Sequence, residues 1–156
     1  MESVYLETTF ISYLAARPSG DLVVAAHQKT TQDWWLTRRS EFRCHVSQLV
    51  IDEISAGDPA EAQKRLAVIA GLGNLELSPE VISLAGAIMA AGMLPPHAYA
   101  DAAHVAVATV HGVDYLLTWN CKHLANAQIA RQIARVCESR GRRMPIICTP
   151  EELMGT

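Results

Sequence analysis

The pattern of hydrophobic and polar positions divides the chain into short apolar runs and longer segments with helical spacing. Short runs rich in β-branched and aromatic residues predict strands, at residues 3–6, 42–47, 74–78, 113–118 and 144–149. Segments whose apolar residues recur every three or four positions predict helices, at residues 7–16, 21–40, 48–57, 58–73, 79–94, 95–112 and 126–141. The last residues, "PEELMG", predict a closing turn.

This regular alternation of strands and helices indicates the fold class. Short apolar strands separated by helices are typical of a parallel sheet that is covered on both faces. The chain shows no internal repeat, low-complexity tract or linker. We therefore expect an α/β protein with three layers, α/β/α, around a short central parallel sheet, and a single domain over residues 1–156.

Composition narrows the class of protein further. Half of the 156 residues are hydrophobic and 19% are charged, which predicts a sizeable core rather than a disordered chain. The formal net charge of −3 gives no overall basic field, so any contact with nucleic acid must come from a local patch. The four cysteines lack metal-ligand spacing, and no run approaches the roughly 20 apolar residues of a membrane helix. With no apparent leader, we expect a cytoplasmic protein with reduced thiols and no membrane contact.

Polar residues lie where the predicted strands end. Glu7 follows the first strand directly, and Asn120 follows the fourth, which ends on Thr118. Glu53 lies in the helix entered from the second strand, and Asp101 in the helix that precedes the fourth. Ligands of open parallel sheets bind outside the carboxyl ends of the strands. Each residue alone has an ordinary interpretation, as a helix-dipole acid, a solvated helix face or a turn residue.

Taken together, these acids predict a metal site. Two carboxylates about 4 Å apart repel by about 4 kcal/mol at an effective dielectric constant near 20. No Lys or Arg directly follows any of these positions to offset that repulsion. A hard divalent cation such as Mg²⁺ or Mn²⁺, which prefers oxygen ligands, would make such a cluster tolerable.

Four segments of the chain carry a resemblance to a known family. They are "VYLETTFISYL", "CHVSQLVIDEI", "YADAAHVAVATVHGVDYLLTWNCKHLAN" and "MPIICTPEEL". In this order they resemble the PIN-domain family, and most closely the VapC-like toxins of toxin–antitoxin pairs. The third segment is the most specific, and the resemblance spans essentially the whole chain.

The resemblance implies a function and a set of site residues. It implies an Mg²⁺- or Mn²⁺-dependent endoribonuclease that cleaves RNA, forms a homodimer and is neutralised by a cognate antitoxin. The implied acidic pocket consists of Glu7, Glu53, Asp101 and Asn120, with Glu7, Asp101 and Asn120 as metal ligands. The resemblance also implies that the Thr8 hydroxyl supports the first acid and that Thr118 contacts the water shell of the metal or a phosphate.

One position departs from the family pattern. The first acid of the family is usually Asp, whereas this chain has Glu7, whose extra methylene moves the carboxylate by about 1.5 Å. This departure leaves an alternative open, a degenerate PIN-like domain that binds RNA or a protein partner without cutting. A receiver-like domain is disfavoured, because the chain lacks a paired acid run after the first strand and a Lys after the last.

Basic residues and histidines are further candidates, for RNA contact and for zinc ligation. The candidate RNA contacts are Arg38, Arg39, Arg43, Arg140, Arg142 and Arg143. The alternative is that these cations only complement helix dipoles. His104 and His111 lie seven residues apart on one predicted helix, which favours packing or surface positions over zinc ligation. His123 matches a family position, and we interpret it as structural.

Overall fold

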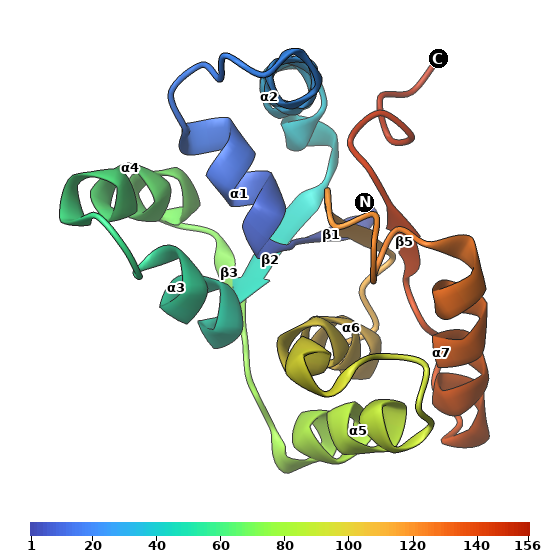
Figure 1. The fold of residues 1–156 in the computed structure, drawn as a ribbon. Coiled ribbons are helices and arrows are strands. Elements are labelled where there is room, and N and C mark those ends of the chain that lie inside the picture. The colour runs from blue at the N-terminus through green and yellow to red at the C-terminus, as the bar shows by residue number, and fades with distance from the viewer.

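A five-stranded parallel sheet with helices on both faces forms the frame of the protein (Figure 1). The computed structural model describes residues 1–156. The strand order is β3-β2-β1-β4-β5, and every neighbouring pair is parallel. The strands are β1 Ser3–Leu6, β2 Arg43–Ser47, β3 Gly73–Leu75, β4 Tyr115–Leu117 and β5 Ile146–Cys148. The predicted three-layer α/β/α fold class is confirmed.

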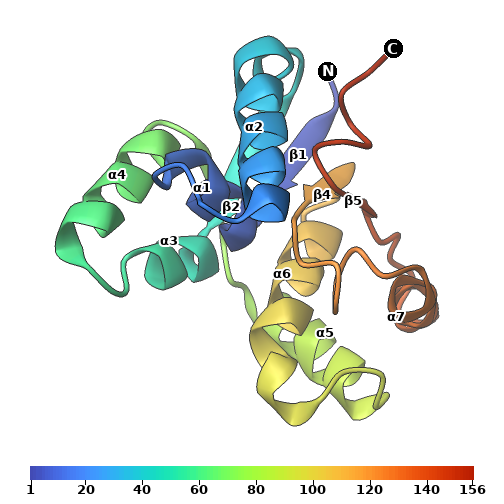
Figure 2. The same cartoon turned by 45° about the horizontal axis from the view of Figure 1, so that its top comes forward.

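Helices α1 to α4 pack on one side of the sheet and α5 to α7 on the other (Figures 1 and 2). The helices are α1 Thr8–Ala15, α2 Leu22–Thr37, α3 Gln48–Ile54, α4 Pro59–Ile69, α5 Pro79–Ala90, α6 Tyr99–Val110 and α7 Ala127–Ser139. Two short 3₁₀ helices, η1 Arg39–Glu41 and η2 Pro96–Ala98, precede β2 and α6. No helix is both long enough and apolar enough to cross a membrane.

The strand order reverses at the centre of the sheet, between β1 and β4. The chain passes from β1 outward to β2 and β3, and then returns to place β4 on the other side of β1. Leu6 of β1 pairs with Leu117 of β4, and the amide of Glu7 donates to the carbonyl of Leu117 at 3.1 Å. The carboxyl ends of β1 and β4 therefore lie side by side, where open parallel sheets bind ligands.

Burial in the core explains why β1 is apolar and why helix α6 is rich in alanine. All four residues of β1 are buried, as expected for the central strand of a sheet covered on both faces. Helix α6 is buried from Ala102 to Thr109, on the side of the sheet where it packs against α5. Small side chains let such a helix approach its neighbours closely at native packing density.

The structure shortens several predicted elements. The predicted helix 21–40 ends at Thr37 and continues as η1. The predicted helix 95–112 is helical only from Tyr99, because consecutive prolines at 95 and 96 disfavour α-helical backbone before it. The predicted strand 74–78 stops at Leu75, where its partner β2 has reached Ser47 and turns into α3, so residues 76–78 have no strand to pair with.

Candidate active site

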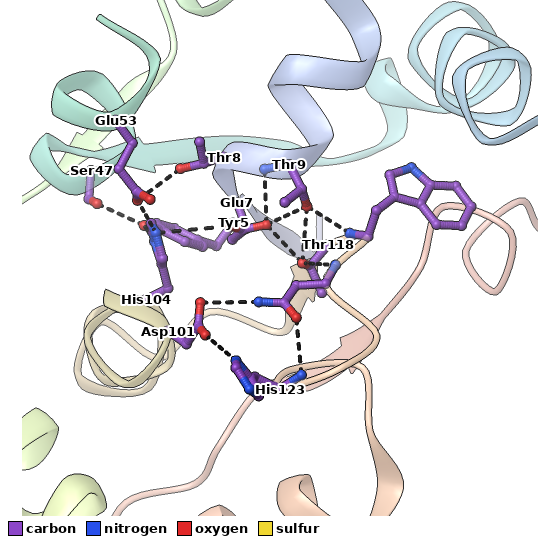
Figure 3. Close-up of polar contacts among 12 residues, drawn as sticks. Tyr5, Glu7, Thr8, Thr9, Ser47, Glu53, Asp101, His104, Thr118 and His123 are labelled. Atoms are coloured by element: carbon purple, nitrogen blue, oxygen red, sulfur yellow. Dashed lines mark hydrogen bonds and ion pairs between the residues drawn. The ribbon is translucent and has the colours of Figure 1, made fainter. Parts of the chain in front are cut away.

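Glu7 lies at the centre of the polar cluster, immediately after β1. It is the N-cap of α1, its side chain accepts from the amide of Thr9 at 3.0 Å, and it is only 3% exposed. The same oxygen, Oε2, accepts from the Thr9 hydroxyl at 2.5 Å and from the Thr118 hydroxyl at 2.8 Å. Neutral donors therefore hold this buried carboxylate (Figure 3), and its ion pair is with His104 and not with a Lys or Arg.

The end of β4 is tied to the start of α1 by the same threonines. Thr118 is fully buried, and its hydroxyl accepts from the amide of Asn120 at 2.9 Å. The Thr9 hydroxyl accepts from the amide of Trp119 at 2.8 Å. The Trp119 indole stacks on the ring of His27, with centroids 4.0 Å apart. These contacts fix the loop that delivers Asn120 to the cluster.

Asp101 and Asn120 form a second polar group from α6 and the loop after β4. Asp101 Oδ1 accepts from Asn120 Nδ2 at 3.1 Å, and Oδ2 lies 2.8 Å from His123 Nδ1. The side-chain oxygen of Asn120, Oδ1, accepts from the backbone amide of His123 at 3.0 Å. The amide of Asn120 thus orients the Asp101 carboxylate, and the structural role inferred for His123 agrees with these contacts.

Glu53 reaches the cluster through a buried histidine. Its Oε1 lies 2.5 Å from His104 Nε2 and accepts from the Thr8 hydroxyl at 3.0 Å. His104 is fully buried, and the same Nε2 lies 4.0 Å from Glu7 Oε1. The imidazole of α6 therefore stands between two acids, one following β1 and one on α3 (Figure 3).

The surroundings of Glu53 and His104 favour a negative charge on Glu53 and a positive charge on His104. Burial is the largest single influence and would raise the pKa of Glu53, but the hydrogen bond and charge of His104 and the hydrogen bond from Thr8 together hold that pKa below its ordinary value. Burial alone would lower the pKa of His104, but the bond to Glu53 and the charge of Glu7 raise it above its ordinary value. Burial also raises the pKa of the Tyr5 hydroxyl, which stays protonated.

The structure gathers the predicted pocket and separates it from the predicted RNA contacts. The six residues that lie together around the carboxyl ends of β1 and β4 are Glu7, Thr8, Glu53, Asp101, Thr118 and Asn120. The six arginines lie toward the amino ends of the strands, since Arg43 begins β2 and Arg143 shortly precedes β5. Within this set, Arg142 pairs with Glu80, and Arg38 pairs with Glu41. Their role as RNA contacts stays a prediction.

Sequence reasoning missed several residues that build the site. His104 is packed, as one of the two interpretations had it, but its contact with Glu53 was not foreseen. Its position gave a signal, because residues three apart on a helix share a face and His104 follows Asp101 by three. Thr9 and Tyr5 were also missed. Nothing in the sequence distinguishes Thr9 from Thr8 as the donor to Glu7.

The donor set agrees in kind with Mg²⁺ or Mn²⁺. Its members are carboxylate and amide oxygens, and Glu7 Oε1 and Glu53 Oε2 accept no hydrogen bond from the protein. As they stand, no three His, Cys, Asp or Glu side chains form a group that could hold a metal ion. Mg²⁺ usually keeps several waters and binds through one or two carboxylates, so it does not require such a group.

Comparisons with known proteins identify the fold. No family model matches the chain, and no curated protein matches it. The structure is similar to that of VapBC2 from Rickettsia felis, solved with a DNA fragment from its promoter, at a TM-score of 0.60 and 13% identity over 94% of this chain and 97% of that one. The chain therefore shares the fold of this VapC-type structure.

A second VapC protein supports the same conclusion. The structure is similar to that of Mycobacterium tuberculosis VapC20, a toxin that cleaves the Sarcin-Ricin loop, at a TM-score of 0.54 and 16% identity over 73% of this chain and 87% of that one. At these identities the likeness establishes the fold, and the fold that the sequence resemblance implies is confirmed.

Proposed function

We propose that the chain is a divalent-metal-dependent endoribonuclease, the toxin of a type II toxin–antitoxin pair. The observation that carries this proposal is the meeting of Glu7, Glu53 and Asp101 at the carboxyl ends of β1 and β4, inside a VapC-like fold. Each acid also has structural partners, but the placement of three acids from three separate elements at one edge of the sheet is what a metal-dependent nuclease requires.

Each residue of the pocket has a proposed task. Glu7, Asp101 and Asn120 would hold an Mg²⁺ or Mn²⁺ ion through their oxygens. Such an ion, when bound, lowers the pKa of a water and stabilises charge on a phosphate. Glu53, which is half-exposed, orients or deprotonates the attacking water as a general base. Thr8 and Thr118 hold the carboxylates of Glu53 and Glu7 in place.

The proposed partners follow from the same assignment. The substrate is RNA, the inhibitor is a cognate antitoxin protein, and the active form is a homodimer in the cytoplasm. VapBC2, the Rickettsia felis neighbour, was solved bound to promoter DNA, which supports a partner of the antitoxin type for this chain. Co-expression with the product of an adjacent small reading frame, followed by co-purification, tests the antitoxin.

The first test is cleavage of a mixed structured RNA by the purified protein with Mg²⁺, with Mn²⁺ and with EDTA. We expect cutting with either metal, none with EDTA, and a loss of at least about 100-fold in Asp101→Asn, because one ligand is then neutral. His111→Asn, at the exposed end of the same helix, is the matched control and should cut like the wild type.

The alternative function is a PIN-like domain that binds RNA or protein without cutting. The observation in its favour is that each of the three carboxylates already accepts hydrogen bonds from the protein. A wild-type protein that neither cuts RNA nor binds Mn²⁺ by calorimetry would support this alternative over the nuclease.

A further inference from the structure

A continuous chain of side-chain contacts runs from the core of the sheet into the acidic pocket. It begins at Ser47, whose hydroxyl lies 2.7 Å from that of Tyr5. The Tyr5 hydroxyl lies 2.7 Å from His104 Nδ1, and His104 Nε2 lies 2.5 Å from Glu53. The first three of these residues are buried, whereas the side chain of Glu53 is 39% exposed (Figure 3).

In the contact between His104 and Glu53, hydrogen-bond chemistry decides which atom donates. An ionised carboxylate can only accept, so the proton between Glu53 and His104 resides on Nε2. A neutral imidazole then accepts from the Tyr5 hydroxyl at Nδ1, and a charged imidazole donates to it. Ser47 can donate or accept, and so it satisfies Tyr5 in both cases. In either state the imidazole presents Nε2–H to Glu53.

We infer that His104 is a positioning residue that holds the Glu53 carboxylate in the pocket opposite Glu7. This inference rests on the proposed nuclease function and adds a member to its site. His104 is fully buried behind the acids and cannot touch substrate, so it acts through Glu53.

The need for such a residue follows from where Glu53 stands. It is on a short helix, α3, near the surface, and its long side chain has rotamers that point to solvent. The Thr8 hydroxyl supplies the only other hydrogen bond to it. Its acidic neighbour Glu7 would repel it electrostatically if no donor stood between them. The imidazole, 4.0 Å from Glu7 and 2.5 Å from Glu53, supplies that donor.

Two substitutions of His104 separate positioning from packing. The amide nitrogen of Gln lies as many bonds from Cβ as Nε2 does, so His104→Gln keeps a donor for Glu53. The amide of Asn lies at the place of Nδ1, so His104→Asn keeps a partner for Tyr5 and loses the contact with Glu53. We expect kcat to fall roughly 10-fold to 100-fold in His104→Asn with KM within about twofold, and to stay within about threefold of wild type in His104→Gln.

A purely structural histidine would behave differently. It would give Gln and Asn variants with equal losses of kcat, tracking their thermal unfolding midpoints, and that result would overturn the inference. Unchanged kcat in His104→Asn would overturn it as well. His111→Asn serves as the matched control, because His111 is exposed and bonds only the Glu76 carbonyl.

A second measurement does not depend on cleavage. In the metal-free protein labelled with ¹⁵N-histidine, we expect a slowly exchanging Nε2–H signal from His104 that shifts and exchanges faster in Glu53→Ala. If the wild type does not cut RNA, the proposed function fails, and this spectrum alone decides whether His104 positions Glu53. A signal that is absent, or unchanged in Glu53→Ala, would overturn the inference even in an active nuclease.

Discussion

At the scale of single residues, the unusual first acid is explained by its contacts. Glu7 Oε2 is within 3.0 Å of three donors, from Thr9 and Thr118, and its other oxygen faces His104. The length of Glu is therefore matched to its surroundings. The sequence departs from the family pattern at this position, but the structure supplies a complete set of partners for the longer side chain.

Shortening this side chain should harm the protein. Glu7→Asp withdraws the carboxylate by about 1.5 Å, and loss of hydrogen bonds to a buried charge costs about 1–3 kcal/mol. We expect a lower free energy of unfolding by urea denaturation and a fall in kcat of at least about 10-fold. Glu7→Gln, which keeps the length and removes the charge, is the control. Higher activity in Glu7→Asp would show instead that Glu detunes the site.

A second carboxylate, far from the pocket, makes stability depend on pH. Asp114 accepts from the backbone amide of Ser3 at 2.7 Å and from its hydroxyl at 3.0 Å, which joins the starts of β4 and β1. The backbone hydrogen bond from Ser3 holds the pKa of Asp114 below its ordinary value. A folded pKa below the unfolded one means that the stabilisation is present above about pH 3.9 and is lost as pH falls through the folded pKa.

Replacing this aspartate should therefore matter at neutral pH and not in acid. We expect Asp114→Asn to unfold at lower urea concentration than the wild type at pH 6, and the difference to close as the pH falls through the lowered pKa of Asp114. Asp52→Asn, at an exposed carboxylate bonded to Gln48 of its own helix, is the matched control. A gap that is the same at every pH would assign the effect to shape rather than charge.

At the scale of elements, the edge strand β3 depends on one glycine. A Cβ on Gly73 would lie 2.4 Å from His45 Nδ1 on the neighbouring strand β2, so a side chain at this position forces the His45 ring to move. We expect Gly73→Ala to destabilise the protein by about 1–3 kcal/mol in urea unfolding, as overpacking does. Gly86→Ala on α5, where a Cβ meets nothing within 4 Å, should stabilise it by about 0.5–1 kcal/mol. Destabilisation of equal size at both sites would contradict this account.

The elements also show what the sequence could and could not predict. Short apolar runs and helical spacing predicted the five strands and the seven α-helices. The signal is clear in β1 and α6, which are buried along nearly their whole lengths and whose composition reflects it. Strand ends were less predictable, since β3 stops where its partner stops and not where its own residues change character. Glu7 and Asn120 were predictable, because their places follow from the ends of their own strands. The contact of His104 with Glu53 depends on α6 lying near α3, which no local pattern encodes.

At the scale of the whole molecule, the distribution of positive charge bears on how RNA would approach. The six candidate arginines lie toward the amino ends of the strands, opposite the acids. Lys122 is exposed and follows Asn120 by two residues, at the edge of the sheet where the acids lie. With a net charge of −3, the protein has no general attraction for RNA, so an exposed cation beside the acids should matter.

This distribution predicts that a cation beside the acids contributes more to RNA binding than a cation at the amino ends of the strands. In an Asp101→Asn background, which leaves RNA uncut, we expect Lys122→Ala to weaken RNA binding and to reduce the slope of log K against log salt by roughly 0.7 to 1. Arg143→Ala is the matched control and should leave both quantities unchanged. The reverse result would place the RNA against the arginines, as the sequence-based prediction has it.

The reversal of strand order between β1 and β4 has a consequence for biosynthesis. The pocket draws on residues 7, 53, 101 and 120, and β1 gains its second neighbour only when β4 docks beside it. A growing polypeptide folds from its amino end, so β1, β2 and β3 can assemble while the last ligand is still unmade. A ribosome-bound or prematurely terminated product that ends before residue 118 lacks both Thr118 and Asn120. The complete pocket therefore exists only once residue 120 of the 156 has been synthesised.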